Sequence, residues 1–112
     1  MLFRSMSRMF RNARIFNQPL NNWNVGGILD INGVLVEGGV TNMSYMFSGA
    51  TSFNEELNNW NVDRVTNMNS MFHNATSFNQ NLSNWRVNND TSTNLMFAGA
   101  TSFNINNRFI RE

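Results

Sequence analysis

A 25-residue repeat constrains this chain more than any other feature of its sequence. Met46, Met71 and Met96 recur at that step, and so do Leu57 and Leu82. A fixed period between about 20 and 50 residues is typical of repeat proteins, in which each unit buries its apolar face only against its neighbours. The repeat therefore predicts stacked units with an extended surface, which favours a binding function over catalysis.

The first half of each unit carries the pattern of a short amphipathic helix. In the unit at residues 40–64, the apolar positions i, i+3, i+4 and i+7 are Met43, Met46, Phe47 and Ala50. A threonine precedes this stripe in three units and is the predicted helix N-cap; these residues are Thr41, Thr66 and Thr91. The stripe predicts a helix of about two turns, which is too short to be stable without packing.

The second half of the unit has the alternation of a short strand. Trp60 and Val62 alternate with polar neighbours, as expected for a strand with one buried face. Stacking would place Trp23, Trp60 and Trp85 in a ladder. Together the two halves predict an α/β fold, a short solenoid of leucine-rich-repeat type with about 3.5 repeats, as a single domain over residues 1–112.

Twelve extra residues separate the first unit from the second, which makes the offset between them 37 instead of 25. They lie within residues 26–39, where Asn32–Gly33 suits a two-residue type I′ turn between two apolar segments. The segment predicts an inserted β-hairpin with Leu29 opposite Val36. Its apolar face would lie on the repeats or on a partner, or the hairpin would be a tolerated surface insertion.

The last unit departs from the pattern after Phe103. Asn107 takes the leucine position and Ile110 takes the tryptophan position. This predicts a terminal cap or a truncated repeat. Open ends of such a stack would allow end-to-end self-association.

The chain lacks the residues that most catalytic and metal sites need. It has a single histidine and no cysteine. The common zinc sites need several such ligands, and the familiar nucleophilic sites need a base beside a serine or cysteine. No phosphate-binding glycine motif is present. No segment resembles a signal peptide or a membrane span, and the compartment stays undetermined. We expect no enzymatic activity, no cofactor and no metal.

Four of the eight arginines fall in the first fourteen residues. These residues, at helical spacing, are Arg4, Arg8, Arg11 and Arg14. A basic amphipathic helix is one way to bind nucleic-acid phosphate or an anionic membrane. The same residues are also the outward positions of the first unit's apolar stripe, and this structural interpretation is the one we favour.

The residues flanking the buried strand positions would line the concave face of such a solenoid. They are Asn22, Asn24, Asn59, Asn61, Asp63, Asn84, Arg86 and Asn88. Amide side chains donate and accept hydrogen bonds, which suits a protein backbone or a glycan as partner. The alternative is that these asparagines cap and ladder along the repeats and serve structure only, and the sequence does not decide between the two.

Two segments carry a resemblance to a known family: "VTNMSYMFSGATSFNEELNNWNV" and "RVTNMNSMFHNATSFNQNLSNWRV". They resemble the BspA-like leucine-rich-repeat surface proteins, which have the mycoplasma-lipoprotein type of repeat. The resemblance covers Met6 to about Phe103, except for residues 26–39. It implies a surface or secreted protein that acts in adhesion or protein recognition, with no catalytic residues. A remnant of a longer repeat array, without independent function, is the alternative.

Overall fold

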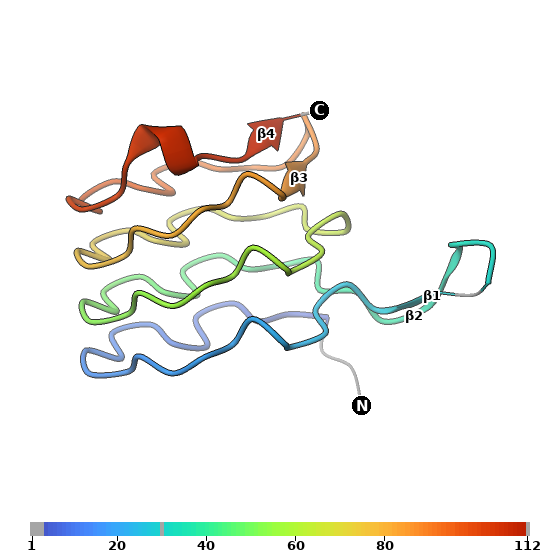
Figure 1. The fold of residues 1–112 in the computed structure, drawn as a ribbon, viewed down its shortest axis with the longest axis horizontal. Coiled ribbons are helices and arrows are strands. Elements are labelled where there is room, and N and C mark those ends of the chain that lie inside the picture. The colour runs from blue at the N-terminus through green and yellow to red at the C-terminus, as the bar shows by residue number, and fades with distance from the viewer. Residues whose placement is uncertain (1–3, 30, 112) are drawn as a thin grey trace.

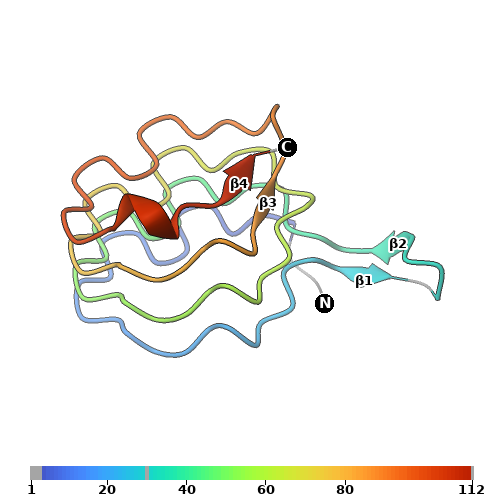
Figure 2. The ribbon, with the colours of Figure 1, turned by 45° about the horizontal axis from the view of Figure 1, so that its top comes forward.

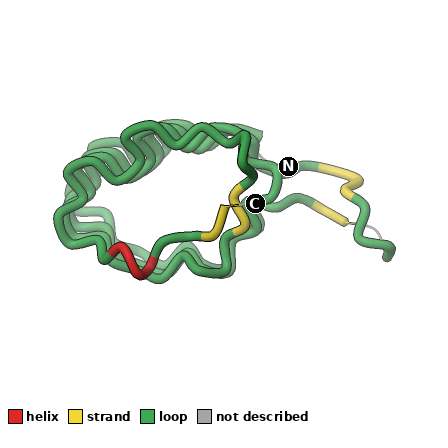
Figure 3. Tube along the Cα trace, turned by 90° about the horizontal axis from the view of Figure 1, so that it is seen from above, coloured by secondary structure: helices red, strands yellow, loops and turns green. Residues whose placement is uncertain are grey.

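The computed structural model describes residues 4–29 and 31–111, and the chain winds through four coils stacked one on the next (Figure 1). We define coil 1 as residues 4–25, coil 2 as 40–64, coil 3 as 65–89 and coil 4 as 90–111. Seen along the stack, the coils superimpose as a flattened ring (Figure 3). Equivalent residues of neighbouring coils therefore lie beside one another through the stack.

The predicted fold class, an α/β solenoid of leucine-rich-repeat type with a helix and a strand in every unit, is wrong. The described residues contain no α-helix, and residues 60–62 do not form the predicted strand. The regular elements are β1 (Ile28–Leu29), β2 (Leu35–Glu37), β3 (Arg86–Val87), the 3-10 helix η1 (Ile105–Asn107) and β4 (Ile110–Arg111). Strands β1 and β2 pair antiparallel, and β3 and β4 pair parallel in a separate sheet (Figure 2).

Consecutive turns replace the predicted helix at residues 43–50. The amide of Met46 donates to the carbonyl of Met43 at 3.2 Å, only three residues back. The amide of Tyr45 donates to the carbonyl of Asn69 in coil 3 at 2.9 Å. Because every second amide bonds to the next coil, the i to i−4 hydrogen bonds of an α-helix do not form.

These turns require left-handed backbone at two positions in every coil. Six of the eight residues there are not glycine and have φ between 56° and 61°; they are Arg8, Asn12, Tyr45, Ser70, Asn74 and Leu95. The other two are Gly49 and Gly99. A non-glycine residue in this conformation costs about 1–2 kcal/mol. The hydrogen bonds between coils offset that cost, since an unbonded buried amide would cost a comparable amount.

The apolar stripe is buried as the sequence indicates, although the backbone is not helical. Met43, Met46, Phe47 and Ala50 have no exposed surface. The threonines ahead of the stripe are not N-caps. The hydroxyl of Thr66 donates to the carbonyl of Thr41 in the previous coil at 3.2 Å, because the side chain points along the stack and there is no helix to cap.

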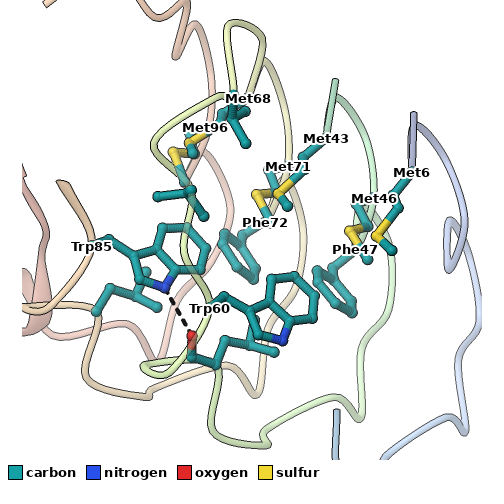
Figure 4. Packing of buried hydrophobic residues seen from close by; sticks show 14 of the residues in the cluster. Met6, Met43, Met46, Phe47, Trp60, Met68, Met71, Phe72, Trp85 and Met96 are labelled. Carbon is teal, nitrogen blue, oxygen red and sulfur yellow. Dashed lines mark hydrogen bonds between the residues drawn. The ribbon is translucent and has the colours of Figure 1, made fainter. Parts of the chain in front are cut away.

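Two columns of stacked phenylalanines run through the core. The first contains Phe10, Phe47, Phe72 and Phe97, and the second contains Phe16, Phe53, Phe78 and Phe103. Ring centroids lie 5.4–5.6 Å apart along the first column and 5.9 Å apart along the second. Buried methionines pack beside the first column (Figure 4). Each inner ring thus contacts equivalent rings in the coils on both sides.

The predicted tryptophan ladder forms between two of its three members. Trp60 and Trp85 stack with centroids 6.4 Å apart. The indole N–H of Trp60 donates to the Leu20 carbonyl at 2.8 Å. The indole N–H of Trp85 donates to the Leu57 carbonyl at 2.8 Å, as the dashed line in Figure 4 marks. Trp23 is 40% exposed and lies tilted against Phe10, as Trp60 does against Phe47, but it does not stack on Trp60. Each buried indole therefore ties its coil to the preceding one.

In coil 4, Phe109 and not Ile110 occupies the tryptophan position. Phe109 is 6% exposed and lies 6.3 Å from Phe97 at 32°, the same geometry as Phe47 and Trp60. Ile110 is exposed and pairs with Arg86 across β3 and β4. The prediction for Ile110 is wrong because the last coil reaches this point one residue earlier than the 25-residue step requires.

Strands β1 and β2 form a hairpin that projects away from the stack between coils 1 and 2 (Figures 1 and 3). Leu29 lies opposite Leu35 and not opposite Val36, because a bulge shifts the register. Four apolar residues of the hairpin are exposed: Ile28, Leu29, Ile31 and Val34. The hairpin thus presents apolar side chains to solvent and does not fold back onto the core.

Substitution of Gly49 by alanine should lower the free energy of unfolding by about 1–3 kcal/mol. Gly49 has a φ of +72°, and a Cβ atom there would collide with the Oδ1 atom of Asn12 in coil 1. Gly33 has a φ of +80° with nothing within 4 Å of its Cβ position. Chemical denaturation of both alanine variants separates the two effects, because Gly33→Ala has the backbone strain without the collision.

A second variant tests the collision between a methyl group at position 49 and Asn12. Asn12→Gly removes the side chain that the new methyl group would meet, so it should restore part of the stability lost in Gly49→Ala. Equal losses for Gly49→Ala and Gly33→Ala, with no recovery on adding Asn12→Gly, would show that close packing of coils 1 and 2 at this point is wrong.

Candidate functional site

One set of asparagines serves the structure. Asn17, Asn54, Asn79 and Asn104 form a column through the stack. In each pair the side-chain Oδ1 atom accepts the backbone N–H of the equivalent asparagine in the next coil, at 2.8–2.9 Å. The amide groups in this column are used to hold neighbouring coils together, and no prediction assigned them a binding role.

The eight residues predicted as a binding face are all exposed. Five of them line one open surface hollow of about 390 Å³ between coils 2 and 3: Asn59, Asn61, Asp63, Asn84 and Arg86. We call this the Asn hollow. The remaining three, Asn22, Asn24 and Asn88, do not line it.

Three further residues line the Asn hollow and were missed as site residues: Asn58, Trp60 and Val62. Trp60 and Val62 are buried and lie at its base, while Asn58 is half-buried. The alternation of apolar and polar residues in the sequence indicated that Trp60 and Val62 face inward. These two buried side chains form the floor of the hollow beneath its polar residues. Asn58 lies outside this alternation of apolar and polar residues. Its residue type alone does not distinguish it from the adjacent Asn59.

The residues of the Asn hollow differ in how far the fold already uses them. The Oδ1 atom of Asn61 accepts the Asp63 N–H at 2.9 Å, which closes a tight turn. Among residues 4–29 and 31–111, the side chains of Asn59, Asn84 and Arg86 make no hydrogen bond or ion pair. The fold therefore does not use the donors and acceptors of these three side chains within the described residues.

Asn22 and Asn24 occupy in coil 1 the positions that Asn59 and Asn61 occupy in coil 2. The base of the hairpin interrupts the surface between them. A Cβ atom at Gly26 would lie only 2.7 Å from the Cβ atom of Asn61, so the chain entering the hairpin packs closely against this residue. Asn88 donates from Nδ2 to the Asp63 carbonyl at 3.0 Å and has a structural role.

Opposite charges flank the polar amides of the Asn hollow. Asp63 brings a carboxylate and Arg86 a guanidinium, and both residues are exposed. The hollow can therefore accept hydrogen bonds, donate them, and pair with either sign of charge. It has no histidine or cysteine among its lining residues, and the described part of the chain holds no cluster of three or more metal-ligating residues.

A second open hollow, of about 300 Å³, lies on the same half of the coils. Pro19, Asn21, Asn54, Glu55, Glu56 and Gln80 line it. The Nε2 atom of Gln80 donates to both the carbonyl and Oδ1 of Asn54 at 3.0 Å. Because Asn54 also belongs to the asparagine column, much of the polar lining is committed to structure, and the Asn hollow is the better candidate site.

The four arginines of coil 1 are all exposed. The guanidinium carbons of Arg8 and Arg11 each lie 5.1 Å from the ring centroid of Tyr45 in coil 2. Both side chains thus contact the neighbouring coil through the ring of Tyr45.

The amino-acid sequence matches a protein family described as "Mycoplasma protein of unknown function, DUF285" over residues 2–37 and 37–109. Because the match spans most of the chain, the protein belongs to this repeat family. No curated protein matches the sequence, and no solved structure matches it either. In the described part of the chain, no helix has the length and apolar composition that crossing a membrane requires.

Proposed function

We propose that this protein is a non-enzymatic recognition or adhesion module of the BspA-like type, which binds a polar partner, a protein surface or a glycan, through the Asn hollow. The observation that carries the proposal is that some asparagine side chains bond to the next coil, whereas others make no hydrogen bond within the part of the chain that the structure describes. The column of Asn17, Asn54, Asn79 and Asn104 holds the coils together. The side chains of Asn59 and Asn84 make no hydrogen bond within the described residues.

The floor of the Asn hollow supports the same proposal. Trp60 is 2% exposed and Val62 is 1% exposed, and both belong to the core. The packed layer already fixes the backbone beneath these polar side chains, so binding has to order only the side chains themselves. The hollow is open, and six of its eight lining residues are polar, which suits an extended polar ligand better than a small apolar molecule.

The amide and charged groups also suit the proposed partners chemically. Glycan hydroxyls and peptide groups each both donate and accept hydrogen bonds, and an asparagine amide matches either. Arg86 adds a planar group that forms paired hydrogen bonds with a carboxylate, as found in acidic sugars and acidic side chains.

The test uses a glycan array and a displayed peptide library probed with the purified chain, followed by calorimetry on the best ligand from each. The Asn84→Ala and Arg86→Ala variants should each bind about tenfold more weakly or worse, which corresponds to about 1.4 kcal/mol. Asn94→Ala is the matched control, because Asn94 is exposed on coil 4 and does not line the Asn hollow.

Asn61 is a poorer choice of variant, because its loss would also release the Asp63 turn. An affinity that falls no further in Asn84→Ala and Arg86→Ala than in Asn94→Ala would overturn the proposal. So would a ligand whose chemical-shift changes map away from residues 58–63, 84 and 86.

A further inference from the structure

Four columns of backbone hydrogen bonds connect each coil to the next. In coil 2 the donors are the amides of Met43, Tyr45, Phe47 and Gly49, and the acceptors are carbonyls of coil 3 at 2.8–2.9 Å. The same four positions of coil 1 donate to coil 2, and those of coil 3 donate to coil 4. The geometry between neighbouring coils is therefore the same at all three junctions.

Coil 4 presents the next set of donors. The equivalent amides belong to Thr93, Leu95, Phe97 and Gly99. None of these four amides donates a hydrogen bond within the part of the chain that the structure describes. A row of backbone N–H groups at this spacing is a template for pairing with another chain.

Coil 1 presents the matching acceptors at the other end of the stack. The carbonyls that correspond to the acceptors in coil 2 belong to Ser5, Ser7, Met9 and Arg11. Within residues 4–29 and 31–111, no amide donates to them. The first and last coils that the structure describes thus carry four acceptors and four donors in the same arrangement that joins the coils internally.

The phenylalanine columns end in the same complementary way. Phe47 and Phe72, inside the first column, have no exposed surface, whereas Phe10 and Phe97 at its ends are only partly buried. Met9 is 37% exposed on coil 1, while the equivalent Met46 on coil 2 has no exposed surface. Each end therefore leaves apolar surface that another coil would cover.

We propose that copies of this chain associate head to tail, with coil 1 of one copy stacked on coil 4 of the next. The junction repeats the internal one: four backbone hydrogen bonds, Phe10 stacked on Phe97, and Phe16 stacked on Phe103. The two contact faces are different surfaces of the chain, so each junction leaves one free face of each kind. Such an interface forms open chains of molecules and does not stop at a dimer.

Arg108 lies beside the aromatic surface of this junction. Its guanidinium carbon lies 5.8 Å from the ring centroid of Phe97 and 5.3 Å from that of Phe109. The exposed Arg108 side chain covers part of the aromatic surface on which Phe10 of another copy would stack. It must move aside for association, so Arg108→Ala should strengthen association by removing a competing contact.

Leu95→Arg is the variant that tests the junction. Leu95 is 65% exposed and has a φ of 56°, and the equivalent residue of coil 1 is Arg8 with a φ of 61°. The chain therefore already accommodates arginine at this backbone position. At the proposed junction the new guanidinium would face Arg8 of the next copy, and the like charges would repel.

Ile31→Arg is the matched control. Ile31 is fully exposed on the projecting hairpin, away from both ends of the stack. It makes the same chemical change, from an apolar side chain to arginine. It also tests whether the exposed apolar hairpin is what drives any association.

The measurement is light scattering and sedimentation velocity on residues 1–112 over a wide range of protein concentration. Wild type and Ile31→Arg should exceed the monomer mass of 12.9 kDa as concentration rises, and Arg108→Ala should do so at lower concentration. Leu95→Arg should remain monomeric with an unchanged circular dichroism spectrum. Added to wild type, it should shorten the assemblies, because its intact coil 1 still binds one chain end.

Monomers at every concentration for both wild type and Arg108→Ala would overturn the proposal. Association that Ile31→Arg abolishes and Leu95→Arg leaves intact would also overturn it, and would assign the contact to the hairpin. Assemblies that stop at twice the monomer mass would exclude the head-to-tail arrangement, since that arrangement has no closed dimer.

Discussion

Replacing Phe72 by alanine is expected to lower the free energy of unfolding by about 3–5 kcal/mol. Phe72 has no exposed surface and stacks on Phe47 at 5.5 Å, Phe97 at 5.6 Å and Phe78 at 4.2 Å. The cavity would break the first phenylalanine column in the middle of the stack. Coils on both sides lose contacts, and their backbone hydrogen bonds hold them too rigidly to close the gap.

The loss is measured by denaturant unfolding followed by tryptophan fluorescence. A loss of this size is a large part of the total stability of an ordinary domain, so Phe72→Leu serves as a milder second variant. Phe10→Ala is the internal control, because Phe10 ends the column and is only partly buried. If Phe10→Ala is as damaging as Phe72→Ala, the stacking of rings along the column is not what stabilises the fold.

Replacing Trp60 by alanine should be similarly damaging, at about 3–5 kcal/mol. Trp60 is 2% exposed, stacks on Trp85, and donates its indole N–H to the carbonyl of Leu20. The variant loses buried aromatic surface and leaves that carbonyl without its partner. Thermal unfolding monitored by circular dichroism measures the effect.

Trp60→Phe separates the hydrogen bond from the packing. It keeps an aromatic ring and removes only the N–H donor and part of the ring, so we expect a loss of about 1–3 kcal/mol. Coil 4 is the natural precedent, because Phe109 already fills this position without an indole N–H. A melting temperature that hardly changes in Trp60→Ala would show that Trp60 does not join coils 1 and 2.

The apolar stripe predicted the buried residues of each coil but not their backbone conformation. Met43, Met46, Phe47 and Ala50 are buried whether the segment is a helix or a run of turns. The choice between the two depends on hydrogen bonds to residues 24 positions away, such as Tyr45 to Asn69. Periodicity within one unit carries no information about those bonds, so the α/β prediction failed where local sequence was the sole guide.

The candidate site was predictable in part for a related reason. Alternation with Trp60 and Val62 placed Asn59, Asn61 and Asp63 on the outer surface. The sequence could not distinguish Asn59 and Asn61 from Asn54, because all three are asparagines in a polar segment. Only the structure shows that the side chain of Asn54 bonds to the next coil. Only the alignment of one coil on the next decides which amides find a backbone partner and which remain available.

In coil 4, the prediction of the buried residue was wrong by one position. A strict 25-residue step from Trp85 reaches Ile110, yet the buried ring is Phe109. The short helix η1 precedes it and changes the path of the chain by one residue. Phe109 is therefore the buried residue, and not Ile110, because an aromatic ring at this point packs against Phe97.

The four hydrogen-bond columns also give the stack an electrical axis. Their N–H groups all point from coil 1 toward coil 4, whereas the threonine column, with Thr66 donating to Thr41, runs the other way. Aligned peptide dipoles add along a helix and leave its carbonyl end partly negative. The same addition makes coil 1 the negative pole, and half of the arginines in the chain lie there. Positive charge is favourable at such a pole, as it is for lysine and arginine near a helix C-terminus.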